Sequence, residues 1–311
     1  MKQPIGQAID AAAAAGSAAL VDLWNQWKGT DARSTESAAL VAEALIGMAR
    51  PEDALVILQN AEDTTRCRQL RALALANTGA VDEAIQLLVI LRDQGQLDEE
   101  TGGLLGGRYK QRGVSSDNPA DLRAAYEVYL ETYRKTGGSY PGINAASLAL
   151  TLGDKEASAR LAAEVLDKVT LPPERMDHWT FATRGEAHLL LEDLPSARTW
   201  YGRAVGGIPN EVKSIATMRR QARANLQALG LDAHALDDVL VVRTVVAFTG
   251  HMLDAPDRTA ARFPASAEGA VRLAIRERLK QLRAGFGFSS VAPGSDVLSW
   301  KNCSTAAAAP G

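Results

Sequence analysis

The sequence has 311 residues, of which 46% are hydrophobic and 23% are charged, and its formal net charge at pH 7 is −3. That apolar content is sufficient for one long solenoid or for two domains. The slight acidic excess argues against a nucleic-acid binder, because neutralising phosphates requires a clustered excess of Lys and Arg.

The start of the chain carries no recognisable targeting signal. Its Ala run from Met1 to Leu20 is interrupted by Asp10, and Ala is too weakly apolar for the core of a signal peptide. A bilayer span needs about 20 strongly apolar residues, and no such run occurs. Cys67 and Cys303 have no motif spacing, which disfavours a zinc site or a disulfide framework. The sequence therefore predicts a cytoplasmic protein without a metal or cofactor.

A short sequence pattern recurs along the first 230 residues. It consists of an apolar helix end, a turn, an acidic residue and an Ala that opens an amphipathic helix. Helix–turn–helix repeats have this appearance, and such repeats usually bind other proteins. The copies lie at residues 74–85, 148–157 and 189–197, with a weaker copy at 50–54.

The Ala after each turn serves as a marker of the repeat. Successive markers are 30 to 41 residues apart, whereas the tetratricopeptide period is about 34. We therefore expect irregular tetratricopeptide-like repeats with insertions, in which a small marker lets two antiparallel helices approach closely. A non-repetitive helical bundle is the alternative, but the shared order of residue types favours repeats. The markers are Ala54, Ala84, Ala125, Ala157 and Ala197.

Two motifs stand near the middle of the chain. Glycines at 102, 103, 106 and 107 would clear one face of a helix for a close neighbour; otherwise the segment is a loop, since each Gly costs about 1 kcal/mol of helix propensity. Further on, Tyr140-Pro141-Gly142 predicts a turn that opens a helix. Asn144, just inside that helix, is expected to satisfy free backbone groups.

These motifs carry a family resemblance. Leu-Leu-Gly-Gly-Arg-Tyr-Lys at 104–110, followed by Tyr-Pro-Gly-Ile-Asn-Ala-Ala at 140–146, resembles the TRAFs-binding domain. That domain precedes the kinase domain of apoptosis signal-regulating kinases and recurs in bacterial tetratricopeptide proteins. The resemblance covers roughly residues 35–230 and implies a helical-repeat fold with a scaffold or regulatory role in signalling. It implies no eukaryotic partner, and this chain contains no kinase sequence.

The composition and the hydrophobic periodicity of the sequence change after Gly230. Apolar β-branched runs at 239–242 and 245–248 predict a buried strand that ends in a loop, and a helix is expected from about 265 to 284. A second strand is predicted at 286–291, which completes one βαβ unit. A parallel sheet needs further strands covered on both faces. We therefore expect a domain cut short near Trp300 and a disordered tail over 301–311.

This βαβ segment is similar to the nucleotide-binding loops of Rossmann-like domains of the SMF/DprA-LOG kind. In such folds, ligands bind beyond the carboxyl ends of parallel strands. The resemblance implies nucleotide contacts from one loop after each predicted strand. The candidate residues are Thr249, Gly250, His251, Gly294, Ser295 and Asp296.

The sequence thus predicts a mainly α protein: a tetratricopeptide-like solenoid over 1–230, a partial Rossmann-like βαβ segment over 239–300, and a tail over 301–311. We expect a non-enzymatic scaffold that binds a protein through its repeats, with no nucleic-acid or membrane partner. The alternative is a nucleotide-sensing or nucleotide-processing protein that acts through the C-terminal segment. No catalytic constellation is evident, because the four His residues show no metal-ligand spacing.

Overall fold

The computed structural model describes residues 5–289, except 171, 210, 256 and 257. It divides the chain into two compact units: residues 1–207 and 221–236 form the first, and residues 208–220 and 237–311 form the second. The boundary between Arg220 and Gln221 falls inside one helix, α13 (Val212–Ala228).

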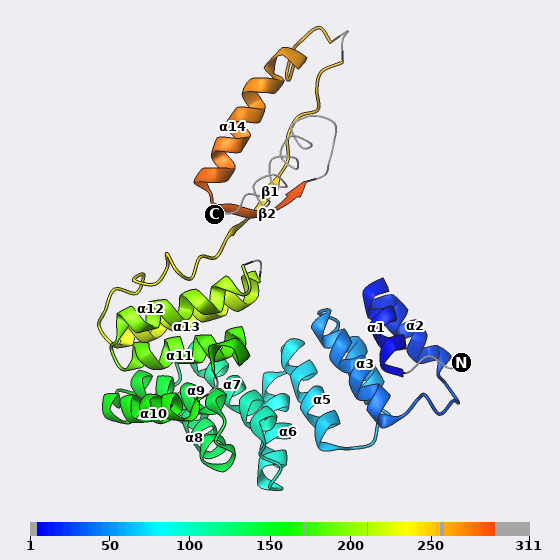
Figure 1. Ribbon diagram of the computed structural model, residues 1–311. Helices are drawn as coiled ribbons and strands as arrows, with labels where there is room; N and C mark the ends of the chain where they lie inside the picture. Colours follow the sequence, from blue (N-terminus) through cyan, green and yellow to red (C-terminus); the bar gives the residue numbers. More distant parts are fainter. Residues whose placement is uncertain (1–4, 171, 210, 256–257, 290–311) are drawn as a thin grey trace. The chain divides into compact units, whose positions relative to one another are not determined.

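The first unit consists of antiparallel helix pairs that follow one another along the chain (Figure 1). A 3-10 turn, η1 (Pro173–Arg175), precedes the last pair. The pairs are α1 (Ile5–Ala15) with α2 (Ser17–Gln26), α3 (Thr35–Gly47) with α4 (Pro51–Leu58), α5 (Thr65–Asn77) with α6 (Val81–Asp93), α7 (Glu99–Ser115) with α8 (Pro119–Thr136), α9 (Ser139–Thr151) with α10 (Lys155–Lys168), and α11 (His178–Leu190) with α12 (Leu194–Gly206). This arrangement confirms the predicted tetratricopeptide-like solenoid.

One turn geometry explains the recurring sequence pattern. In each pair from α3/α4 to α11/α12, the residue before the second helix's N-cap has a positive φ, and the N-cap amide bonds to a carbonyl five residues earlier. Where the N-cap is Asp154 or Asp193, its carboxylate also accepts a backbone N–H at the start of the helix, as favoured N-caps do. The positive-φ residues are Ala49, Gly79, Asp117, Gly153 and Glu192.

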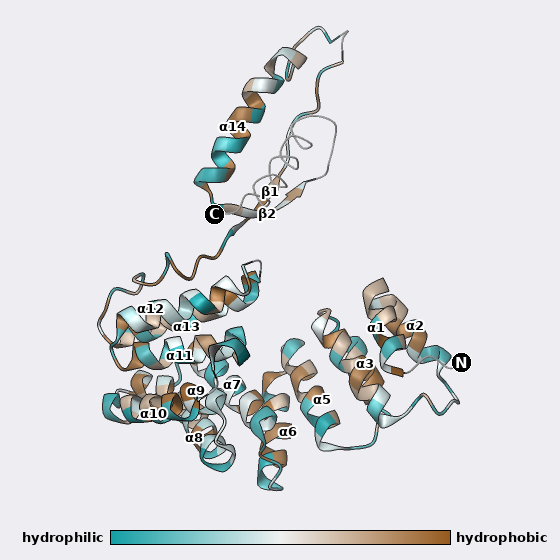
Figure 2. Ribbon diagram, viewed as in Figure 1, coloured by the Kyte–Doolittle hydropathy of each residue, from teal (hydrophilic) through white to brown (hydrophobic). Residues whose placement is uncertain are grey.

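The predicted markers occupy the closest helix contacts. All five marker alanines are buried, each on the second helix of its pair. Most helices carry brown residues along one part of their surface and teal residues along another (Figure 2), as amphipathic helices do. The apolar sides form clusters around Leu45, Leu88 and Tyr129, which are almost completely buried.

The glycine-rich segment is a helix, as one of the two readings predicted. Gly102 and Gly106 lie on the side of α7 that packs against α8, where an added Cβ would overlap Thr132 and Tyr129. Gly142 likewise makes room for Tyr133 and Val165. The lost helix propensity is therefore offset by close packing.

The first helices of the pairs form what we call the inner layer: α3, α5, α7, α9 and α11. Each contacts the next member of the layer, whereas the second helices pack mainly between their own first helix and the following one. Because neighbours lie closest on the concave side of a solenoid, the inner layer is the concave one and α4, α6, α8, α10 and α12 are the outer layer.

The second unit contains a small βαβ motif. Strands β1 (Thr244–Phe248) and β2 (Ala284–Ser289) pair in parallel, and the crossover runs through the 3-10 turn η2 (Ala265–Ala267) and α14 (Glu268–Gln281). Ile275 and Leu279 of α14 pack with Phe263 against Val246 and Phe248. The opposite sheet face is open among the described residues: Val245 is 53% exposed and Phe288 is 69% exposed.

The predicted βαβ topology is thus confirmed, with corrections to its extent. Helix α14 ends at Gln281 instead of about 284, β2 begins at Ala284 instead of 286, and β1 is largely exposed instead of buried. Residues 239–242 were expected to be strand, but β1 begins only at Thr244. The six residues of β2 pair with 244–248 and offer no partner to the earlier run. The predicted end near Trp300 and the tail over 301–311 lie outside the described residues.

Candidate binding surface

An ion-pair ladder crosses three helices of the inner layer. Arg66 of α5 contacts Glu43 of α3 at 2.9 Å and Glu100 of α7 at 3.3 Å. All three side chains remain substantially exposed, so the pairs contribute little to stability. Exposed charges on a concave surface are instead available to a partner. Inner-layer helices pack about 10 Å apart, so the ladder is about 20 Å long, which matches about six residues of extended peptide.

The two sequence motifs meet further along the inner layer. Tyr140 of α9 is 50% exposed, packs edge-on against Tyr129 with ring centroids 6.0 Å apart, and lies over Gly103. Asn144, one turn later, accepts a hydrogen bond from Lys110 of α7 at 3.2 Å. The exposed tyrosine and Asn144 belong to the motif at 140–146, and Lys110 belongs to the motif at 104–110, so the fold brings the two motifs into contact.

Asn144 does not have the expected role at the helix start. Helix α9 begins at Ser139 with Gly138 as N-cap, so Tyr140-Pro141-Gly142 forms its first turn. The side-chain amide of Asn144 donates to the Tyr140 carbonyl instead of accepting a free backbone N–H. The prediction was wrong because the Asn144 side chain bonds to a carbonyl of its own helix and to Lys110 of another helix, and not to an N–H left free at the helix start.

A buried polar network extends from this contact. It joins α7, α9 and α11 of the inner layer to the part of α13 that belongs to the first unit. Lys110 donates to the Gln221 side chain at 2.8 Å, Ser147 donates to Asn225 at 2.7 Å, and Asn225 donates to Glu186 at 3.0 Å. Ser147 and Asn225 are each 1% exposed. Sequence reasoning missed this network, apart from placing Asn144 and Lys110 in the two motifs.

Glu186 is the acidic end of the polar network. Burial raises the pKa of Glu186 above its ordinary value, while the Lys110 ammonium and the amides of Asn225 and Gln221 oppose that rise. Burial therefore disfavours the ionised carboxylate. Such a group stabilises the fold most when protonated, and that stabilisation is lost as pH rises through its raised pKa.

The predicted nucleotide loops can be located only in part. Thr249, Gly250 and His251 directly follow β1 and are exposed, which places them at the carboxyl end of a parallel strand. Gly294, Ser295 and Asp296 lie outside the described residues. The nucleotide-binding role of these six residues stays a prediction.

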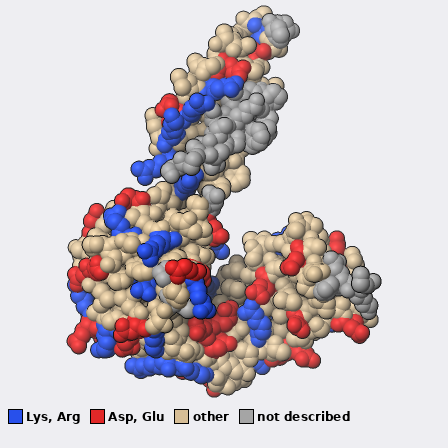
Figure 3. All heavy atoms as spheres, viewed as in Figure 1, with Lys and Arg blue, Asp and Glu red and all other residues tan. Residues whose placement is uncertain are grey.

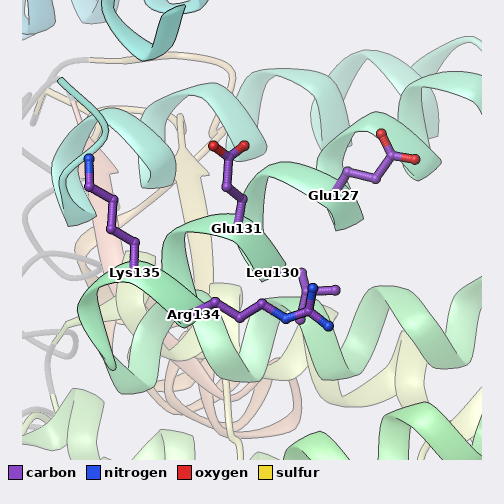
Figure 4. A pocket seen from close by; sticks show the side chains of 5 residues that line it. All are labelled: Glu127, Leu130, Glu131, Arg134 and Lys135. Atoms are coloured by element: carbon purple, nitrogen blue, oxygen red, sulfur yellow. The ribbon is translucent and has the colours of Figure 1, made fainter. Parts of the chain in front are cut away.

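A depression on the outer layer is a weaker candidate. It has a volume of about 560 Å³ and is lined by five residues of α8 alone, with acidic and basic side chains side by side (Figure 4). No second element encloses it, so it lacks the convergence of groups that a ligand site needs. The lining residues are Glu127, Leu130, Glu131, Arg134 and Lys135.

Basic side chains also form a row along α14 in the second unit (Figure 3). Arg272, Arg276 and Lys280 are exposed there, and Glu268 and Glu277 pair with members of the row. Interspersed acids make this a solvated helix face. In the described part of the chain, no cluster of His, Cys, Asp and Glu could hold a metal ion. No helix of the same residues has the length and apolar character needed to cross a bilayer.

The comparison with known families identifies the repeats. Residues 51–149 match the family described as Tetratricopeptide Repeats-Sensor, a stretch that runs from α4 almost to the end of α9. It includes both motifs, from the glycine-rich α7 to Asn144. No curated protein compared with the chain matches it. With the paired helices, shared turns and buried markers, the match shows that this is a tetratricopeptide-like helical-repeat protein.

Proposed function

We propose that this protein is a non-enzymatic interaction module, a scaffold or regulator that holds a segment of a partner protein on the inner layer of its repeats. The observation that carries the proposal is the exposed ladder of Glu43, Arg66 and Glu100, together with Tyr140, whose ring lies over Gly103, three residues after Glu100 on α7. Tetratricopeptide-like repeats are in general protein-interaction or sensing modules. The resemblance to the TRAFs-binding domain over about 35–230 supports a signalling role.

The chemistry of the ladder suggests what the segment carries. Two carboxylates flank one guanidinium, so a segment with basic and acidic residues in alternation can exchange each intramolecular pair for an intermolecular one. An aromatic such as Tyr140, half exposed at the end of the ladder, is a typical anchor for an apolar side chain. We therefore expect a short segment of mixed charge with one apolar residue.

Site-specific crosslinking tests this function. A photoreactive phenylalanine analogue is placed at Tyr140 on the inner layer or at Ile90 on the outer layer, positions that are both 50% exposed. In cells that make the protein, we expect a discrete crosslinked partner from position 140 and none from position 90. Arg66→Gln should reduce the yield from 140 several-fold. Equal yields from both positions, or no effect of Arg66→Gln, would exclude the inner layer as the binding surface.

The alternative function is nucleotide sensing or processing through the partial Rossmann-like segment proposed over 239–300. It is favoured by one observation, the position of Thr249, Gly250 and His251 directly after a parallel strand. We expect calorimetric titration of the full chain with ATP or GTP to show no saturable binding, because a two-stranded sheet holds its loops weakly. Micromolar binding that is abolished by Gly250→Val would move the function to this segment.

A further inference from the structure

The second half of α13 makes contacts that a repeat helix does not make. In a repeat array, each unit contacts only its sequence neighbours. Gln221 follows α12 closely in the chain, yet its side chain accepts a hydrogen bond from Lys110 of α7 at 2.8 Å, across 111 residues of sequence. Side chains of residues 221–228 therefore bond to α7, α9 and α11.

These contacts use side-chain amides on one face of the helix. Gln221 and Asn225 are four residues apart, so they lie on the same side of α13. Gln221 bonds to Lys110 and Ser147, and Asn225 bonds to Ser147 and Glu186. Between them, the two amides engage side chains from three successive inner-layer helices, as the side chains of a bound peptide would.

Polar contacts of this kind are exchangeable. Each hydrogen bond makes only a small net contribution to stability, because water or another ligand can replace it. Leu226 on the same helix and Leu229, one residue beyond its end, are the apolar anchors, and Leu229 packs against the cluster around Tyr129. Displacement of the segment must therefore replace these hydrogen bonds and also expose Ala222 and Leu226, which are 1% and 0% exposed, so the incoming partner has to fill both the polar and the apolar positions.

We propose that residues 221–228 of α13 occupy the inner layer in cis and that a partner segment displaces them in order to reach Lys110, Asn144 and Glu186. This regulation rests on the proposed function, since it assigns a competitor to the part of the inner layer that adjoins Tyr140 through Lys110 and Asn144. An attached segment acts at an effective concentration near millimolar, so it suppresses weak partners. Because the boundary between the two units falls within α13, displacement of 221–228 acts directly on the helix that the units share.

The test uses the full chain with two paired variants. Gln221→Ala/Asn225→Ala removes both amides, and Gln227→Ala removes an exposed amide from the same helix as the control. Amide hydrogen exchange is measured over α5, α9 and residues 221–228. A fluorescent peptide spanning residues 212–230 is titrated into each protein.

We expect exchange over 221–228 to increase at least tenfold in the double variant while α5 and α9 keep their protection. The peptide should bind the double variant and should not bind the wild type or Gln227→Ala. Unchanged exchange over 221–228, loss of protection throughout α7 to α12, or release of 221–228 without peptide binding would each overturn the proposal. None of these measurements needs the partner protein. The proposed function can therefore fail in the crosslinking experiment while the exchange and peptide measurements still test the displacement by themselves. Where both hold, crosslinking from Tyr140 should rise in the double variant.

Discussion

Replacement of Ala84 by Asp is expected to destabilise the protein by about 3–5 kcal/mol, the cost of leaving a buried charge without a partner. Ala84 is completely buried at the contact between α5 and α6, among Ala72, Ala76 and Leu88. No basic side chain belongs to that cluster. The midpoint of urea denaturation, followed by circular dichroism at 222 nm, measures the change.

The control introduces Asp two residues later on the same helix. Gln86 lies on α6 as well but is exposed, so Gln86→Asp changes only helix propensity, by a few tenths of a kcal/mol. Similar losses from the two variants would mean that the marker position is not a close helix contact. A broad or two-step transition for Ala84→Asp alone would indicate that the array unfolds from this repeat outward.

The repeat could be predicted only where its local signals coincide. Gly153 followed by Asp154 supplies a residue suited to positive φ and then a good N-cap, so that copy is plain in the sequence. The turns at Ala49, Asp117 and Glu192 have the same backbone form without Gly. A non-Gly residue in this conformation costs about 1 kcal/mol or more. The packing of the flanking helices must offset that cost. The copies at 189–197 and 50–54 were recognised instead from the acidic residue and the Ala that follow the turn.

The packing role of the glycines could be predicted, but their partners could not. Spacing alone placed Gly102 and Gly106 on one face of a helix. That they face Thr132 and Tyr129 depends on how α8 lies against α7. The polar network was beyond prediction for the same reason: Lys110, Asn144 and Gln221 meet only after the three helices α7, α9 and α13 have packed. Asn144 was interpreted from its neighbours in sequence, and one of its two partners, Lys110, is on α7.

The overextended strand at 239–242 has a different cause. β-branched residues fit a pleated, half-buried surface, and they form a strand only where a neighbouring strand is present. β2 pairs with Thr244–Phe248 alone, and Leu240 is buried without belonging to the sheet. Composition therefore predicted the region and the parallel topology correctly, while the start of the strand was set by the length of its partner.

Adding one methyl group at Gly106 or at Gly107 should have opposite effects. A Cβ at Gly106 would lie 2.7 Å from the ring of Tyr129, which is 1% exposed and has no free space to retreat into. We expect Gly106→Ala to destabilise the protein by about 2 kcal/mol, since overpacking outweighs the gain in helix propensity. At Gly107 the nearest atom would be the Tyr129 hydroxyl at 3.6 Å, an ordinary contact. Gly107→Ala should therefore stabilise by up to about 1 kcal/mol.

The same pair of variants connects packing to the proposed binding surface. Tyr140 packs edge-on against Tyr129, so a shift of the Tyr129 ring in Gly106→Ala displaces the exposed tyrosine on the inner layer. Under conditions where both variants are fully folded, we expect partner crosslinking from position 90 of α6 to be absent in both and partner binding to weaken only in Gly106→Ala. Equal stability of the two variants would show that α7 and α8 are not in close contact at Gly106. Equal binding despite unequal stability would show that the position of Tyr140 does not matter to the partner, and the ladder around Arg66 would then carry the interaction alone.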